Sequence, residues 1–168
     1  GLDWPTSLEL IRRSIDAARD VPGALLASGA GTDHLAPEAA RSVDDVIRAY
    51  EEQIEAIEKL GGRIILMASR ALARVAKSPD DYHRVYDRIL SQVREPVIIH
   101  WLGEMFDPAL AGYWGRADHL EAMDVAVAAI NRNAARVDGV KVSLLDKDKE
   151  IAMRRRLDAS VKMYTGDD

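Results

Sequence analysis

The chain has 168 residues, of which 48% are apolar and 30% charged, with no cysteine and a formal net charge of −5. This composition is typical of a soluble globular protein, and the missing cysteines exclude disulfides, thiolate metal sites and a cysteine nucleophile. The acidic balance argues against nucleic-acid binding, and the lack of an apolar run of about 18 residues argues against a membrane span, so we expect small-molecule partners and a cytoplasmic location.

The first third of the chain predicts two helices separated by a short strand. Residues 7–20 carry apolar side chains at helical spacing, and a Pro-Gly pair ends that helix. The apolar run 24–28 predicts a buried strand that leads into a glycine-containing loop at 29–34. A second helix is expected over 42–60, where acidic residues in the first turn suit the helix dipole.

The rest of the chain continues the alternation of strand and helix. Strands are expected at 63–68, 96–100, 137–143 and 161–164, and helices at 79–93, 118–136 and 147–156. A long loop is expected from Trp101 to Arg116, and loops of that length are usually functional. Its aromatic side chains would either form a lid over a site or pack beneath the loop.

This alternation of Val/Ile/Leu-rich strands with amphipathic helices predicts an α/β protein whose parallel strands are covered by helices. Two architectures fit, part of a (βα)₈ barrel and a five-stranded doubly wound sheet. The glycine loop does not follow the G-x-G-x-x-G pattern, because position 34 is histidine, and this disfavours a dinucleotide site. The first residue is Gly1 rather than Met, and residues 163–168 are typical of a strand end and turn, so we expect a fragment of a longer protein.

Polar residues follow the predicted strands at their carboxyl ends, where both architectures place their sites. The members of this set are Thr32, Asp33, His34, Ser69, Arg70, His100, Glu104, Lys141, Ser143, Asp146, Tyr164, Asp167 and Asp168. Among them, His100 could be an acid–base group, a metal ligand or a hydrogen-bonded strand end. His34 could belong to the site or to a turn, and we expect His83 and His119 to be ordinary surface residues.

Lys141 is the most informative of these residues. Strand alternation puts Lys141 and Ser143 on one face and the neighbouring valines on the other, which meets the helices. Burial of an amine lowers its pKa and raises the neutral fraction that can attack a carbonyl group. The alternative is a structural ion pair with Asp167 or Glu104, and the spacing leaves both open.

Three segments of the chain resemble a known family. P-V-I-I-H at 96–100, G-V-K-V-S at 139–143 and Y-T-G-D-D at 164–168 resemble, in order and spacing, the P-V-I-L-Y-N, G-I-K-D and S-G-D-D segments of dihydrodipicolinate synthase and N-acetylneuraminate lyase. S-G-A-G-T at 28–32 resembles the end of that family's third strand. Through G-L-D-W, G-A-G-T-D, I-H-W-L-G-E-M-F and M-Y-T-G-D-D, the chain is similar over nearly its full length to an uncharacterised bacterial group of dihydrodipicolinate synthase-like proteins.

The resemblance implies a (βα)₈ TIM barrel, of which residues 1–168 would be a single partial domain with about five parallel strands. It also implies that Lys141 is the Schiff-base lysine and that His100 stands where the family has a catalytic tyrosine. Residues 1–4 lack the family's threonine pair, and Glu104 lies near the position of the expected arginine. These differences argue against pyruvate as the substrate.

We therefore expect a class I aldolase or lyase that needs no cofactor or metal and acts on a small carbonyl compound, with Lys141 and His100 as catalytic residues. The expected substrate-binding residues are Asp33, His34, Arg70, Glu104, Ser143, Tyr164 and Asp167. The full-length protein is expected to form a homo-oligomer. Two alternatives stay open, metal-assisted chemistry at His34, His100 and Glu104 or Asp33, and a non-catalytic barrel that binds a ligand.

Overall fold

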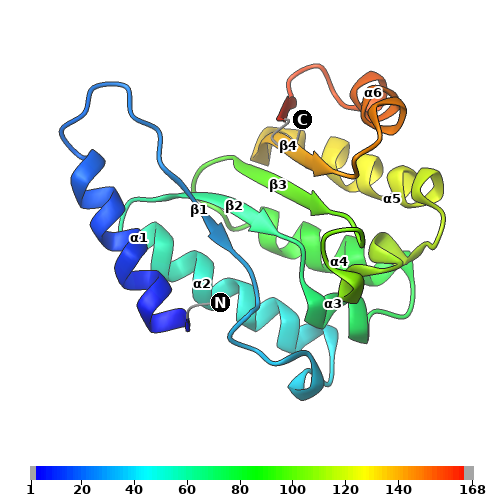
Figure 1. The fold of residues 1–168 in the computed structure, drawn as a ribbon, viewed down its shortest axis with the longest axis horizontal. Helices are drawn as coiled ribbons and strands as arrows, with labels where there is room; N and C mark the ends of the chain where they lie inside the picture. The colour runs from blue at the N-terminus through cyan, green and yellow to red at the C-terminus, as the bar shows by residue number, and fades with distance from the viewer. Residues whose placement is uncertain (1–2, 165–168) are drawn as a thin grey trace.

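Five parallel strands form one sheet in a computed structural model that describes residues 3–164. The strands are β1 (Ala27–Ala30), β2 (Arg63–Met67), β3 (Val97–Leu102), β4 (Val137–Ser143) and β5 (Lys162–Tyr164). Each strand pairs in parallel with the next one along the chain (Figure 1). A doubly wound sheet reverses its strand order at a switch point, whereas this order runs from β1 to β5 without reversal, as it does in a barrel.

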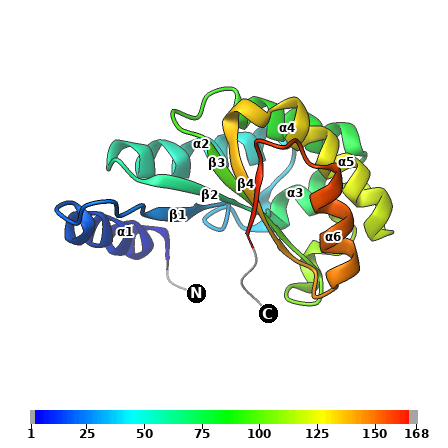
Figure 2. The same ribbon diagram turned by 90° about the horizontal axis from the view of Figure 1, so that it is seen from above.

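Six α-helices accompany the sheet in the described part of the chain. They are α1 (Trp4–Ala18), α2 (Val43–Lys59), α3 (Arg70–Val75), α4 (Pro79–Leu90), α5 (His119–Arg132) and α6 (Lys147–Arg156). Figure 2 shows α2, α4 and α5 along the convex side of the curved sheet, with α1 beside β1 at one end. No helix within residues 3–164 is both long enough and apolar enough to cross a membrane.

The core lies between the sheet and these helices. We call the side of the sheet that faces the helices the outer face and the other side the inner face. Apolar outer-face residues such as Leu66, Ile99 and Val140 are at most 1% exposed. Inner-face positions of the same strands, such as Met67 and Ile98, are only half-buried. The inner face is therefore the side of the sheet that the helices of this chain leave uncovered (Figure 2).

The helices begin where side chains satisfy their free backbone N–H groups. In α2, Ser42 Oγ accepts from the Asp45 backbone N–H, and the Asp45 carboxylate accepts from the Ser42 backbone N–H, which makes a complete capping box. The Asp118 carboxylate caps α5 by accepting from the backbone N–H groups of Leu120 and Glu121. These caps fix the ends from which the loops around the site depart.

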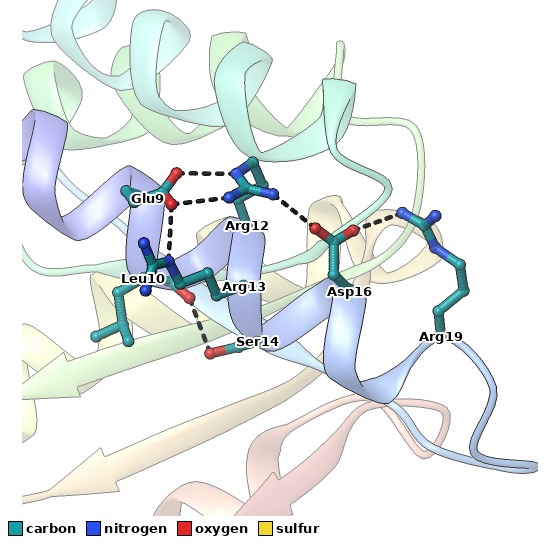
Figure 3. Close-up of polar contacts among 7 residues, drawn as sticks. All are labelled: Glu9, Leu10, Arg12, Arg13, Ser14, Asp16 and Arg19. Carbon is teal, nitrogen blue, oxygen red and sulfur yellow. Dashed lines mark hydrogen bonds and ion pairs between the residues drawn. The ribbon is translucent and has the colours of Figure 1, made fainter.

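A chain of ion pairs covers the exposed face of α1 (Figure 3). Glu9 accepts from Arg12 and Arg13 at 2.7 Å, and Asp16 accepts from Arg12 at 2.8 Å and from Arg19 at 2.6 Å. The hydrogen bonds from the two arginines lower the pKa of Glu9 to about 2. Exposed pairs of this kind contribute little to stability, so the packing of α1 against α2 is what holds the helix on the domain.

The bounds expected for two elements at the start of the chain are wrong, although both elements are present. The strand expected at 24–28 lies at Ala27–Ala30 instead, because pairing with β2 begins at Ala27 and Leu25 is 63% exposed. The helix expected to begin at Ser7 begins at Trp4, after the Asp3 carboxylate caps it by accepting from the Thr6 backbone N–H.

The region after β2 also differs from the expectation. The short helix α3 was not predicted, and Ser69 caps it through its Oγ. The helix expected at 79–93 ends at Leu90, and the one expected at 118–136 ends at Arg132 before a turn of 3₁₀ helix.

The expected loop 101–116 is partly ordered into regular structure. β3 continues to Leu102, and two 3₁₀ turns follow at Pro108–Leu110 and Tyr113–Gly115. Trp101, Tyr113 and Trp114 are buried at no more than 4% exposure, while Phe106 is 45% exposed. Trp101, Tyr113 and Trp114 therefore pack beneath this segment and do not form a lid, whereas Phe106 stays exposed.

Candidate functional site

The inner face of β3 and β4 brings together three polar side chains near the carboxyl ends of these strands. His100 pairs in register with Lys141 across the two strands, and Ser143 follows two residues later on the same face of β4. Ser143 Oγ lies 3.2 Å from His100 Nε2 and 3.4 Å from Lys141 Nζ. In this chain His100 and Ser143 are buried and Lys141 is half-buried.

An irregularity in the pairing of β3 with β4 determines which side chains of β4 face inward. Val97 pairs with Val137 and Ile98 with Gly139, so Asp138 is an extra residue in β4. From Gly139 onward the pairing is continuous to Ser143. Since a one-residue shift moves every side chain to the other face, this irregularity is part of what puts Lys141 on the inner face.

Arg70 and Asp33 lie close together beyond the carboxyl ends of β1 and β2. We call the residues beyond the carboxyl ends of the strands the rim of the site. Arg70, the first residue of α3, donates through Nε to Asp107 Oδ2 at 2.6 Å, and its Nη1 lies 3.4 Å from Asp33 Oδ1. The Asp33 side chain is 78% exposed, so this second contact is weak. Asp107 was not singled out from the sequence, although its position before Pro108 marks a 3₁₀ turn that its carboxylate caps.

Glu104 forms a second rim group with two residues that the sequence did not indicate. The Glu104 carboxylate lies 2.9 Å and 3.0 Å from His119 Nε2, and His119 Nδ1 lies 3.1 Å from Lys149 Nζ. A carboxylate can only accept and an ammonium group can only donate, so His119 Nε2 carries a proton that it donates to Glu104, and Nδ1 accepts from Lys149 Nζ. The expectation that His119 is an ordinary surface residue is wrong, because its side chain is only 18% exposed.

Opposing influences act on the ionisation of Glu104. Burial raises its pKa, but a hydrogen bond from its own backbone N–H and the hydrogen bond from His119 outweigh burial, so the pKa is lowered overall. Glu104 is thus an anion that accepts a hydrogen bond from His119 and whose charge Lys149 partly balances.

Both ring nitrogens of His34 lie within hydrogen-bond distance of side chains of α2. Its Nδ1 lies 2.8 Å from Gln53 Nε2, and its Nε2 lies 3.2 Å from Glu52. Gln53, which is 5% exposed, also accepts from the Gly31 backbone N–H at 2.8 Å. Among residues 3–164, no three or more His, Cys, Asp or Glu side chains gather closely enough to hold a metal ion. The metal set of His34, His100 and Glu104 or Asp33 is therefore not assembled.

Tyr164 reaches toward the start of β4. Its hydroxyl donates to Asp138 Oδ2 at 2.6 Å, and Lys162 Nζ donates to Asp138 Oδ1 at 2.9 Å. These two hydrogen bonds, the one from Tyr164 being the stronger influence, lower the pKa of Asp138. Asp167, which was also expected at the site, lies outside the described residues.

A network of buried hydroxyl groups supports the carboxyl ends of β1 and β2. Thr32 Oγ1 and Ser69 Oγ are 2.6 Å apart, and the Ser69 backbone N–H donates to Tyr113 Oη at 3.1 Å. Tyr113 Oη is also 3.1 Å from Tyr86 Oη. This network joins two strand ends to α4 and to the segment after β3, and it fixes the backbone from which Arg70 departs.

A protein family profile described as "Protein of unknown function (DUF993)" matches residues 1–168. No curated protein matches the chain.

Solved structures match the fold. A putative dihydrodipicolinate synthase family protein from Coccidioides immitis has a TM-score of 0.66 and 19% identity, over 98% of this chain and 44% of that one. Dihydrodipicolinate synthase from Oceanobacillus iheyensis has a TM-score of 0.63 and 14% identity, over 98% and 43%. A putative dihydrodipicolinate synthetase from Pseudomonas aeruginosa has a TM-score of 0.62 and 14% identity, over 98% and 47%.

The chain therefore spans less than half the length of these structures and matches about half of their barrel. This confirms the partial (βα)₈ barrel and the structural resemblance to dihydrodipicolinate synthase. At these identities the likeness concerns the fold, and function has to be argued from the site itself.

Proposed function

The chain belongs to DUF993, a family of proteins of unknown function, and from that premise we propose that it acts as a Schiff-base lyase on a small carbonyl compound. Lys141 is the amine and His100 is the proton-transfer group. One observation carries the proposal: both side chains lie within hydrogen-bond distance of the same buried Ser143 hydroxyl. The barrel fold, which solved structures named as dihydrodipicolinate synthases share, supports it.

The proposed chemistry begins with the Lys141 amine. Its nitrogen attacks the carbonyl carbon, a C–N bond forms, and the carbonyl oxygen leaves as water. The resulting iminium ion withdraws the electron pair of an adjacent C–C or C–H bond. His100 gives or takes the proton that this step requires, which is a role that imidazole fulfils near neutral pH.

The rim groups suit the binding of a polar substrate. We propose that two pairs of residues, Arg70 with Asp33 and Glu104 with His119, contact the polar groups of the substrate from the segments that follow β1, β2 and β3. Both signs of charge are present at this rim, so a substrate with both donors and acceptors would fit better than a simple anion.

Reductive trapping tests the proposal. The chain is incubated separately with acetaldehyde, acetone and pyruvate, reduced with borohydride, and digested for peptide mass spectrometry. We expect a mass gain on the peptide that contains Lys141. Lys141→Arg should reduce labelling there to background, because guanidinium stays protonated at any working pH, while circular dichroism shows an intact fold.

Lys162→Arg is the matched control. Lys162 also lies in the sheet, but it is 64% exposed and paired with Asp138, so this variant should retain the labelling of Lys141. If none of the three compounds labelled Lys141 above other lysines, the amine would not be reactive and the proposal would fail. The non-catalytic, ligand-binding alternative would then be preferred.

A further inference from the structure

The buried hydroxyl group of Ser143 lies beside both proposed catalytic side chains. Ser143 is 1% exposed, and its Oγ is within hydrogen-bond distance of both proposed catalytic side chains. Its backbone is also fixed, because Ser143 pairs with Leu102 in β3 and its carbonyl accepts from the Gly103 N–H at 3.0 Å. The hydroxyl is therefore held at a set position between two strands.

The donor and acceptor capacities of Lys141, Ser143 and His100 determine which atom donates in each of these contacts. An ammonium group can only donate, so the contact between a charged Lys141 and Ser143 runs from Nζ–H to Oγ. A hydroxyl that accepts in this way still has one proton to donate, and His100 Nε2 is an acceptor when the imidazole is neutral and protonated on Nδ1. The three groups then form a directed sequence from Lys141 through Ser143 to His100.

We propose that Ser143 relays a proton between Lys141 and His100, an inference that rests on the proposed function. Nζ of the ammonium gives one proton to Oγ while the hydroxyl gives its own proton to Nε2. The products are a neutral amine, an unchanged hydroxyl and an imidazolium ion, so one positive charge moves from lysine to histidine. The amine can then attack the carbonyl carbon.

The reverse transfer completes the step. The imidazolium ion returns its proton through the same hydroxyl to the carbonyl oxygen, and a second proton passes to that oxygen from the amine nitrogen. The oxygen leaves as water as the C=N bond forms, and one proton stays on the iminium nitrogen. Ser143 is thus a positioning residue that acts through Lys141 and His100 and is regenerated in each cycle.

The test measures the rate at which Lys141 of the full chain is labelled by acetaldehyde and cyanoborohydride over a range of acetaldehyde concentrations. Ser143→Ala should lower the maximal rate on the order of tenfold to 100-fold, with little change in the half-saturating concentration, because general acid–base transfer is lost while access to the site is retained. His100→Gln should cause a similar loss. The double variant should be no slower than the slower single variant, since both substitutions break one pathway.

Ile89→Val is the control for a loss of stability alone. Ile89 is 0% exposed in α4 and belongs to the hydrophobic core. This variant should melt at a lower temperature, because a buried methyl group is lost, and still label Lys141 at the wild-type rate, because no polar group is removed.

The outcomes separate the relay from the proposed function. A Ser143→Ala protein that labels Lys141 at the wild-type rate would overturn the relay and leave the lysine assignment standing. A double variant whose loss is the product of the two single losses would also overturn it, because the residues would then act separately. Equal labelling of position 141 peptides in wild type and Lys141→Arg would instead reject the proposed function.

Discussion

Gly139 lies beneath the ring of Tyr164 at the start of β4. A Cβ atom at this position would lie 2.5 Å from Tyr164 Cε2 and 2.9 Å from the backbone oxygen of Lys162. Because a backbone oxygen in a paired strand cannot move away easily, we expect Gly139→Ala to lower the free energy of unfolding by about 1–3 kcal/mol. Urea unfolding followed by circular dichroism measures this change.

Gly29→Ala is the control for this prediction. At Gly29 a Cβ atom would meet the flexible Met67 side chain at an ordinary contact distance of 3.4 Å. We expect its effect to stay within about 0.5 kcal/mol of zero. Equal losses in the two variants would show that the close approach at Gly139 has no energetic consequence.

The central residues of the site could be predicted from the sequence, but its rim could not. Strand alternation is enough to put Lys141 and Ser143 on one face, since side chains in a strand point alternately to opposite sides. Asp107, His119 and Lys149 could not be found this way. They reach the rim through the turns after β3 and the starts of α5 and α6, and the course of those segments depends on long-range packing.

At the scale of the element, two helix starts offer a matched comparison. Ser42 accepts from the Asp45 backbone N–H at the start of α2, whereas Ser78 at the start of α4 makes no side-chain capping hydrogen bond. Ser42→Ala should therefore lower the free energy of unfolding by about 0.5–2 kcal/mol, the usual cost of a lost cap. Ser78→Ala should change the free energy of unfolding by less than about 0.5 kcal/mol. Urea unfolding of both variants checks the difference.

The elements that the sequence predicts well are those in which local signals agree. For 147–156 the predicted helix coincides with α6, which Asp146 caps, and for 137–143 the predicted strand coincides with β4. The strand expected at 24–28 is displaced because apolar character is only a local signal, whereas pairing with β2 sets the real start at Ala27. The helix α3 has six residues, too few for a helical period to stand out.

At the scale of the whole molecule, local patterns left two architectures open. Both a barrel and a doubly wound sheet repeat strand and helix, and they differ in strand order. That order is a long-range property, and here it runs from β1 to β5 without reversal. The resemblance of the segments at 96–100 and 139–143 to a barrel family was what indicated the correct architecture.

The five tyrosines provide a test of the packing of the whole molecule, because each resists ionisation in the folded state. Burial raises the pKa of Tyr50, Tyr82, Tyr86 and Tyr113, and the hydrogen bond to Asp138 raises the pKa of Tyr164. In the unfolded chain a tyrosine releases its proton near pH 10, so above that pH the unfolded state binds fewer protons than the folded state. Stability is fully present below about pH 10 and falls as the pH rises toward the raised pKa values, by up to about 1.4 kcal/mol per pH unit for each of the four buried tyrosines.

We therefore expect alkaline titration to show tyrosinate absorbance and loss of circular dichroism in one cooperative step above about pH 10. Tyr164→Phe should remove one tyrosine from that step and leave it cooperative, because the four other rings belong to α2, α4 and the segment after β3. Gradual appearance of tyrosinate near pH 10 with circular dichroism unchanged would contradict the prediction. It would mean that water reaches the hydroxyl groups of Tyr86 and Tyr113 in the folded protein, and that the network beneath the site is open.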